Sequence, residues 1–188
     1  MKKATILLLL IICNYSFSQN TLTDTKLKPG IYLTYESLLK NKPLKYENLI
    51  VKKEKAEKNW QKKETYILGF NLKMSNEESD KLGAIIGFCD GENIYLTLSR
   101  DFYNNSALFY KVESIGHFLY YEGTYRNNNY SLINTTNVID IHTKKIYQNF
   151  TNGNLKKIIS DKPELLTKFK KEKKKYTLYR KYLKKYSE

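Results

Sequence analysis

The fold class is decided by residues 84–98, which read AIIGFCDGENIYLTL. Two apolar runs, 84–89 and 94–98, flank the polar segment Asp90-Gly91-Glu92-Asn93. An Asp-Gly pair between apolar runs is a strong signal for a β-hairpin, because glycine readily adopts the positive φ that such a turn needs. We therefore expect two antiparallel strands joined at Asp90–Asn93.

Further short strands are predicted on both sides of this hairpin. They cover residues 47–53, 65–72, 107–113, 117–124, 130–133, 138–142 and 145–150. The lysine-rich run 52–63 fits an exposed hairpin tip or a twisted edge. Strands at this spacing, separated by Asn- and Gly-containing turns, predict a mainly β (α+β) chain built as an antiparallel β-meander, sandwich or partly open barrel.

Two helices complete the predicted fold. Thr34 can cap a short N-terminal helix over 35–40, which Pro43 stops. Near the C-terminus, Asp161 can cap a long basic helix over 162–188, with Pro163 in its first turn. Apolar residues from Leu165 to Tyr186 recur there at mostly three- and four-residue steps, with a polar interruption around Glu172-Lys173. That amphipathic stripe predicts a helix docked on the domain.

The first eighteen residues have the three zones of a secretory signal peptide. Lys2 and Lys3 are followed by the apolar run 5–12 and then by Ser16-Phe17-Ser18, with small residues where a signal peptidase cleaves. The apolar run is shorter than the roughly 20 residues of a spanning helix. Ile12 before Cys13 argues against lipidation of that cysteine. We expect cleavage after Ser18 and a β-rich domain over 19–161.

The net charge of +14 is concentrated in the C-terminal segment. Residues 162–188 hold eleven Lys or Arg and three acids, which is +8, and two more positive charges lie in the signal peptide. The body therefore carries only +4. Arginine is scarce, with three residues against thirty lysines. This scarcity argues against specific nucleic-acid binding, because base and phosphate recognition relies on the forked guanidinium of arginine.

Tyrosines crowd the central strands, and two interpretations are open. Tyrosine suits half-buried sheet positions, where it packs against its neighbours. Outward tyrosines would instead form a stacking platform for sugars or peptides. The binding candidates on this second interpretation are Tyr103, Tyr110, Tyr120, Tyr121 and Tyr125. Both faces of 118–121 are apolar, which favours two covered faces.

The basic segment 162–188 also has two interpretations. Simple docking on the sheet would leave a solvated lysine side. Alternatively, a lysine-rich amphipathic helix can lie on an anionic membrane surface. The membrane-surface candidates are Lys170, Lys171, Lys174, Lys175, Lys181, Lys184 and Lys185.

No motif predicts a catalytic residue, a metal site or a cofactor. Cys89 and His117 are a conceivable nucleophile–base pair, but a half-buried cysteine before a turn is ordinary. Asp140 and His142 would share one face of a strand, a minimal metal pair, but two exposed polar residues near a turn explain them better. After cleavage Cys89 is the sole cysteine, so neither an internal disulfide nor a four-ligand Cys/His zinc site is expected.

Three blocks of the sequence resemble a family of small exported proteins from bacteroidete-type bacteria. They are Pro29–Thr34 followed by Asn41-Lys42-Pro43, Gly87–Tyr95, and Pro163–Leu166 with the lysine-rich segment after it. The family has no assigned function. The resemblance therefore implies export and a single domain, and it implies no active site.

The leading functional hypothesis is an exported, non-enzymatic binding module of the envelope or medium, with an unidentified envelope ligand or protein as its partner. The first alternative is an accessory protein attached to an anionic membrane surface through 162–188. The second is a hydrolase of envelope polymers. The signal peptide leaves the periplasm, the cell surface and the medium open as destinations.

Overall fold

The computed structural model describes residues 27–46, 49–59, 64–97, 108–126 and 132–188. The predicted signal peptide and Tyr103 lie outside these residues, so both stay predictions. About a third of the chain is helix and about a third is strand. The class is therefore mixed α+β rather than mainly β, because the C-terminal region contributes several helices to the core.

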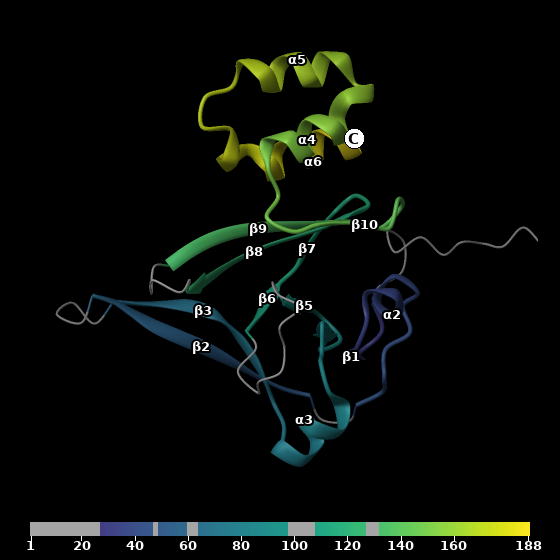
Figure 1. The fold of residues 1–188 in the computed structure, drawn as a ribbon, viewed down its shortest axis with the longest axis vertical. Helices are drawn as coiled ribbons and strands as arrows, with labels where there is room; N and C mark the ends of the chain where they lie inside the picture. The colour runs from purple at the N-terminus through teal and green to yellow at the C-terminus, as the bar shows by residue number, and fades with distance from the viewer. Residues whose placement is uncertain (1–26, 47–48, 60–63, 98–107, 127–131) are drawn as a thin grey trace, which may run out of the picture.

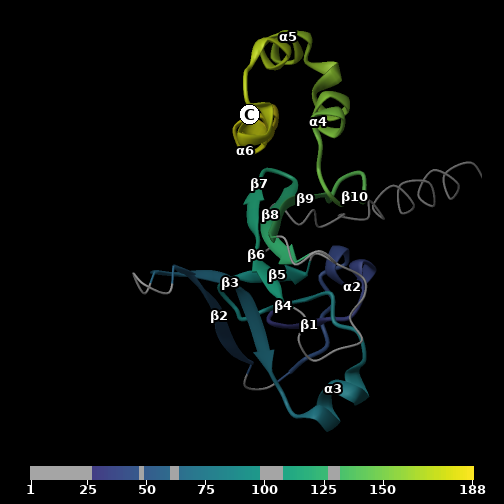
Figure 2. The same ribbon diagram turned by 60° about the vertical axis from the view of Figure 1, so that its left-hand side comes forward.

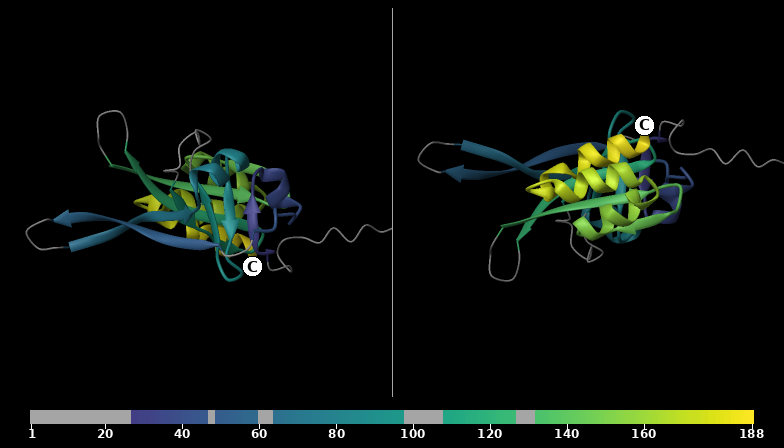
Figure 3. Two further views of the ribbon diagram at one scale, coloured as in Figure 1. Left: turned by 90° about the horizontal axis from the view of Figure 1, so that it is seen from below. Right: turned by 90° about the horizontal axis from the view of Figure 1, so that it is seen from above.

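Six antiparallel strands form the first sheet, in the order β1-β4-β5-β6-β3-β2. Their bounds are Gly30–Tyr32 (β1), Ile50–Asn59 (β2), Glu64–Lys73 (β3), Gly87–Cys89 (β4), Ile94–Thr97 (β5) and Phe109–Lys111 (β6). The lysine-rich β2 lies at one edge, where charged side chains discourage pairing with other chains. The ribbon of β2 and β3 projects beyond the rest of the molecule (Figure 3).

The hairpin predicted from residues 84–98 is confirmed at β4 and β5. Cys89 pairs with Ile94 across the turn. Gly91 has a φ of +101°, a conformation that L side chains rarely adopt. A side-chain oxygen of Asp90 accepts hydrogen bonds from the backbone amides of Glu92 and Asn93, at 2.9 and 2.7 Å. The turn is thus held by the Asp and Gly that signalled it.

The second sheet is a four-stranded antiparallel meander, in the order β10-β9-β8-β7. Its strands are Glu113–Ile115 (β7), Phe118–Arg126 (β8), Leu132–Asp140 (β9) and Lys145–Tyr147 (β10). The single strand predicted over 107–113 is wrong, because the chain crosses from the first sheet to the second at Val112. That residue is buried between the sheets, so the crossing itself contributes to the core.

The two sheets pack face to face, neither of them closes, and helices cover the far face of the second sheet (Figures 1 and 2). Alternation along β8 decides which side chain enters which layer. Leu119 and Tyr121 lie in the cluster between the sheets. Phe118 and Tyr120 lie in the cluster beneath the helices. Both faces of this strand are therefore covered, as its sequence predicted.

Two short helices flank the first sheet. The predicted N-terminal helix forms as α2, Tyr35–Leu39, with Thr34 and Ser37 making a reciprocal capping box. Helix α3, Asn76–Leu82, begins at a second such box between Ser75 and Glu78. Its Leu82 packs on the outer face of the first sheet, around Phe88.

The C-terminal region forms a helix layer rather than one long helix. Its elements are α4 (Asn152–Ile158), η1 (Ile159–Asp161), α5 (Pro163–Lys171), η2 (Lys175–Leu178) and α6 (Tyr179–Ser187). The prediction of a single helix over 162–188 is therefore wrong. Glu172 is extended and Lys174 is left-handed, with φ of 50°, so the chain reverses there.

The reversal lies where the sequence interrupts its apolar stripe, and Glu172 holds it. Glu172 accepts a hydrogen bond from the Tyr182 hydroxyl at 2.9 Å and one from the Lys181 ammonium at 3.4 Å. Asp161 is not the cap of α5; it accepts a hydrogen bond from the Tyr186 hydroxyl at 3.1 Å. Helix α6 thus packs on the sheet while α5 packs back on η1 and α6, an arrangement that one straight helix could not make (Figures 1 and 2).

The helix layer shares a core with the second sheet. Phe118 and Val138 of the sheet and Leu155, Ile159, Phe169 and Leu183 of the helices all have no exposed surface. At its end, α6 approaches the β7–β8 turn so closely that a Cβ at Gly116 would lie 2.4 Å from that of Ser187. Residues 162–188 are accordingly part of the folded body.

Candidate functional site

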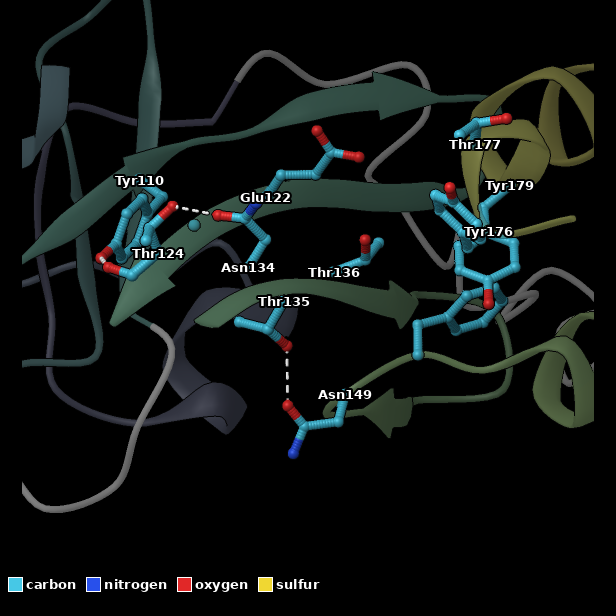
Figure 4. A pocket seen from close by; sticks show the side chains of 12 residues that line it. Tyr110, Glu122, Thr124, Asn134, Thr135, Thr136, Asn149, Tyr176, Thr177 and Tyr179 are labelled. Atoms are coloured by element: carbon cyan, nitrogen blue, oxygen red, sulfur yellow. Dashed lines mark hydrogen bonds between the residues drawn. The ribbon is translucent and has the colours of Figure 1, made fainter. Parts of the chain in front are cut away.

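A groove lies where β8 and β9 run out from under the helix layer (Figure 4). Its volume is about 750 Å³. Side chains from both strands, the β10–α4 connection, β6 and the η2–α6 segment line it: Tyr110, Glu122, Thr124, Asn134, Thr135, Thr136, Asn149, Phe150, Tyr176, Thr177 and Tyr179. Most of these side chains are polar.

The floor of the groove comes from the register of two strands. Glu122 pairs with Thr136, and Thr124 pairs with Asn134. Because side chains alternate along a strand, these four residues lie on the same sheet face as the buried pair Tyr120 and Val138. The face thus changes from apolar to polar over one cross-strand pair, at the point where the helices stop covering it.

Hydrogen bonds fix two amide side chains in the groove. The Thr124 hydroxyl lies 2.6 Å from Asn134 Oδ1, and the Thr135 hydroxyl lies 2.7 Å from Asn149 Oδ1 (Figure 4). With each amide oxygen engaged in this way, the Nδ2 groups of Asn134 and Asn149 have no hydrogen-bond acceptor among the described residues. Two amide nitrogens therefore remain as donors: Asn134 Nδ2 on the face of Glu122, and Asn149 Nδ2 beside Thr135, whose side chain points to the opposite face of β9.

Glu122 is the one carboxylate among the described lining residues, and it is exposed. The Tyr120 hydroxyl donates a hydrogen bond to Glu122 Oε1. Burial, and then the neighbouring carboxylate, raises the pKa of Tyr120 well above its ordinary value. The Tyr120 phenol therefore keeps its proton at neutral pH and, by donating it in a hydrogen bond, orients the Glu122 carboxylate. The other carboxylate oxygen, Oε2, is left to accept a hydrogen bond from a ligand.

The helix layer supplies an aromatic wall. Tyr179, at the start of α6, is buried and packs edge-on against Phe150 at 5.1 Å between ring centroids. Tyr176 in η2 is instead 65% exposed. An exposed aromatic ring beside oriented polar groups can pack against the apolar face of a ligand.

The structure separates the five tyrosines predicted as binding candidates. Tyr110, Tyr120 and Tyr121 are only 6%, 7% and 2% exposed. A ring covered to that extent offers no open face for stacking, so the platform interpretation does not fit these three. Tyr110 still lines the groove, where its hydroxyl donates to the Thr124 carbonyl at 2.7 Å. Tyr125 belongs to β8, but its side chain, like Tyr103, lies outside the described part.

The seven lysines predicted for a membrane surface all lie in the helix layer, and none lines the groove. Lys170 and Lys171 end α5, Lys174 and Lys175 follow the reversal, and Lys181, Lys184 and Lys185 lie on α6. All except Lys175 are exposed.

Cys89 and His117 have separate surroundings. Cys89 is buried between the sheets, and its thiol donates to the Leu27 carbonyl at 3.5 Å. The His117 ring stacks on His142 with centroids 4.3 Å apart, on the side of the helix layer. Asp140, the other candidate, is buried and accepts hydrogen bonds from two backbone amides of the following turn. It therefore acts as a turn cap.

Within the described ranges, no group of three or more His, Cys, Asp or Glu side chains is arranged to hold a metal ion. The same part of the chain contains no helix with both the length and the apolar character that crossing a bilayer requires.

Sequence reasoning missed Glu122, Asn134, Thr136, Asn149 and Tyr176. A weak signal exists, since polar residues occupy positions 122, 124 and 134–136, whereas large apolar residues fill 118–121 and 138–139 of the same strands. Nothing local, however, links these strands to Tyr176. Comparisons with known proteins add no template: no family model matches the chain, and no curated protein or solved structure matches it significantly.

Proposed function

We propose that the protein is an exported, non-enzymatic binding module whose groove takes a neutral glycan of the cell envelope. The observation that carries the proposal is the set of oriented polar groups in an open groove with one exposed aromatic ring, Tyr176. Sites of this kind combine an apolar surface with a few placed donors and acceptors.

The available groups suit a ligand rich in hydroxyls. The amide nitrogens of Asn134 and Asn149 can donate to sugar oxygens, and the free carboxylate oxygen of Glu122 can accept from a sugar hydroxyl. The ring of Tyr176 can cover the C–H face of a pyranose. Asn134 and Glu122 lie on paired strands, so little conformational entropy is lost when a ligand binds to them.

The composition of the groove favours binding over hydrolysis. Glycoside hydrolysis usually requires two carboxyl groups on either side of the scissile bond. Glu122 alone is available among the described lining residues. Export to the envelope rests on residues 1–18, and the resemblance to small exported proteins agrees with it.

The test is a binding screen with residues 19–188, which include every described residue. Purified protein is titrated with soluble envelope glycan fragments, and with peptides as the competing class, by calorimetry and by chemical-shift mapping. We expect a glycan to bind and to shift signals of Glu122, Asn134 and Tyr176. Glu122→Gln and Tyr176→Ala should each weaken binding roughly five- to tenfold, the value of one hydrogen bond or one aromatic contact.

The matched control is Glu92→Gln, which removes an exposed carboxylate at the distant β4–β5 turn. It should bind like the unaltered protein. No binding to any glycan, preferred binding of peptides, or an equal loss in the control would overturn the proposal.

A further inference from the structure

We propose that the outer surface of the helix layer docks on an anionic phospholipid bilayer by electrostatic attraction alone, a role independent of the groove. This surface, the lysine cap, consists of the exposed lysines of α5, α6 and the turn between them: Lys168, Lys170, Lys171, Lys173, Lys174, Lys184 and Lys185. The helix layer forms one end of the molecule, opposite the six-stranded sheet (Figures 1 and 2).

The apolar faces of the helices are directed into the protein core. Phe169, Tyr182 and Leu183 are at most 2% exposed, because they fill the core shared with the second sheet. An amphipathic helix on a membrane normally buries such a face among the acyl chains. Contact with lipid is therefore limited to headgroups, which reach the lysines without any rearrangement of the core.

Within the described residues, the positive charge of the cap is largely unpaired. In the fully described segment 162–188, the ion pairs are Arg180 with Glu113 and Lys181 with Glu172. Neither involves a lysine of the cap. Those seven lysines are exposed, and Glu172, which attracts Lys185, already pairs with Lys181, so the cap keeps a net positive charge, whereas the body of the chain carries only +4.

The kind of cation favours lipid over nucleic acid. Arg180 is the one arginine of the segment, and both its Nε and its Nη2 lie 2.6 Å from Glu113 oxygens. The forked group that recognises phosphates and bases is thus occupied. Lysines act as point charges, and each contributes to attraction by an anionic headgroup layer.

Vesicle co-sedimentation of residues 19–188 tests the proposal. The probes are vesicles of phosphatidylcholine alone and of phosphatidylcholine mixed with phosphatidylglycerol, at low and high salt, with single-stranded DNA as a soluble competitor. The variant carries Lys170→Gln, Lys171→Gln, Lys184→Gln and Lys185→Gln. Truncation at 161 is unsuitable, because it would remove half of a shared core.

The unaltered protein should bind only the anionic vesicles, and high salt should release it. Each lysine near such a surface contributes about a factor of five in affinity, so the fourfold variant should bind at least roughly a hundredfold more weakly. The charge-matched control changes four exposed lysines of the first-sheet end to Gln: Lys45, Lys52, Lys73 and Lys81. This control should retain most of the binding.

Three results would overturn the proposal. One is the absence of binding to anionic vesicles at low salt. Another is an equal loss of binding in the two charge-matched variants, which would indicate attraction by net charge alone. The third is complete release of the protein from anionic vesicles by single-stranded DNA present at a lower concentration than the lipid. That result would mean that the cap binds a soluble polyanion rather than a bilayer.

Discussion

The two halves of the β8–β9 ladder share one face of one sheet, yet they have opposite environments. Towards β7, Phe118 and Tyr120 are buried beneath the helix layer. One step further along the same face, Glu122 is exposed in the groove. The backbone geometry of the two halves is the same. The difference therefore comes from where the helices stop, and η2 marks that boundary with Tyr176 and Thr177.

The groove arises without any break in the strand pairing. The two halves belong to one continuous antiparallel ladder of β8 and β9. They differ in their side chains and in whether the helix layer covers them. Core residues at one end hold the ladder rigid, so polar residues at the other end are positioned before any ligand arrives. The predictions below act on this boundary.

Truncating the covered half should have the largest effect. Phe118→Ala should lower the free energy of unfolding by about 3–5 kcal/mol, because Phe118 is fully buried between the sheet and the helices. Urea denaturation followed by circular dichroism measures the loss. Ile50→Ala, at a residue that is 53% exposed, is the control and should change stability by no more than about 0.5 kcal/mol. A similar loss in both variants would contradict the assigned core.

Placing a polar residue in the buried half, or an apolar residue in the groove half, should have an intermediate effect on the free energy of unfolding, and the first change should cost more than the second. Val138→Thr places a hydroxyl in the fully buried half and should cost about 1–3 kcal/mol. Thr136→Val, two residues away on the same face, removes a hydroxyl from the partly exposed half and should cost about 1 kcal/mol or less. Denaturation of both variants under one condition checks the order. Equal costs would mean that the boundary is misplaced.

The smallest effect concerns His117, which lies at the edge of the covered half. Burial lowers the pKa of its imidazole below the ordinary value of 6.5. The charge of Asp140 acts to raise this pKa and His142 acts to lower it further, and the net shift is downward. The unfolded chain then binds the proton more readily than the folded chain. Stability is therefore fully present above pH 6.5 and declines as the pH falls through the lowered folded-state pKa.

Denaturation midpoints measured between pH 7 and about pH 5 test this dependence, with His117→Gln as the variant that no longer titrates. The variant should show a shallower decline than the unaltered protein. The carboxyls of Glu78 and Glu172 also have lowered pKa values, so their contribution is lost below the ordinary value of 4.5, in a separate range. A steeper decline in His117→Gln would contradict the lowered pKa.

Local signals predicted most of the strands correctly. The Asp90-Gly91 turn, the helix that begins after Thr34 and the alternation at 118–121 depend on short-range rules of turn chemistry, capping and strand periodicity. One error is local: 130–133 and 138–142, predicted as separate strands, form the single strand β9, because the polar residues between them also pair with β8. The other errors occur where a distant contact decides. The chain passes from the first sheet to the second at Val112, because strands on either side of it pair in different sheets. Helix α5 ends at Glu172, where the side chain accepts hydrogen bonds from Tyr182 and Lys181.

The site was harder to foresee than the fold. Tyrosine content drew attention to Tyr120 and Tyr121, whose rings are buried. Tyr176, which is exposed beside the groove, belongs to a segment predicted only as part of a lysine-rich helix. Its proximity to Asn134 and Glu122 follows from the reversal after α5, and no pattern within either segment predicts that reversal's direction.

The sequence by itself determined the hairpin at Asp90–Asn93, the alternating faces of β8, and the concentration of positive charge after residue 161. These follow from properties of neighbouring residues: positive φ at glycine, a strand period of two, and net charge. Tertiary structure alone decided that two sheets stack, that the basic segment folds back as two helices, and that Glu122 and Tyr176 share a groove. Those outcomes depend on which apolar faces cover one another, a competition among residues far apart in the chain.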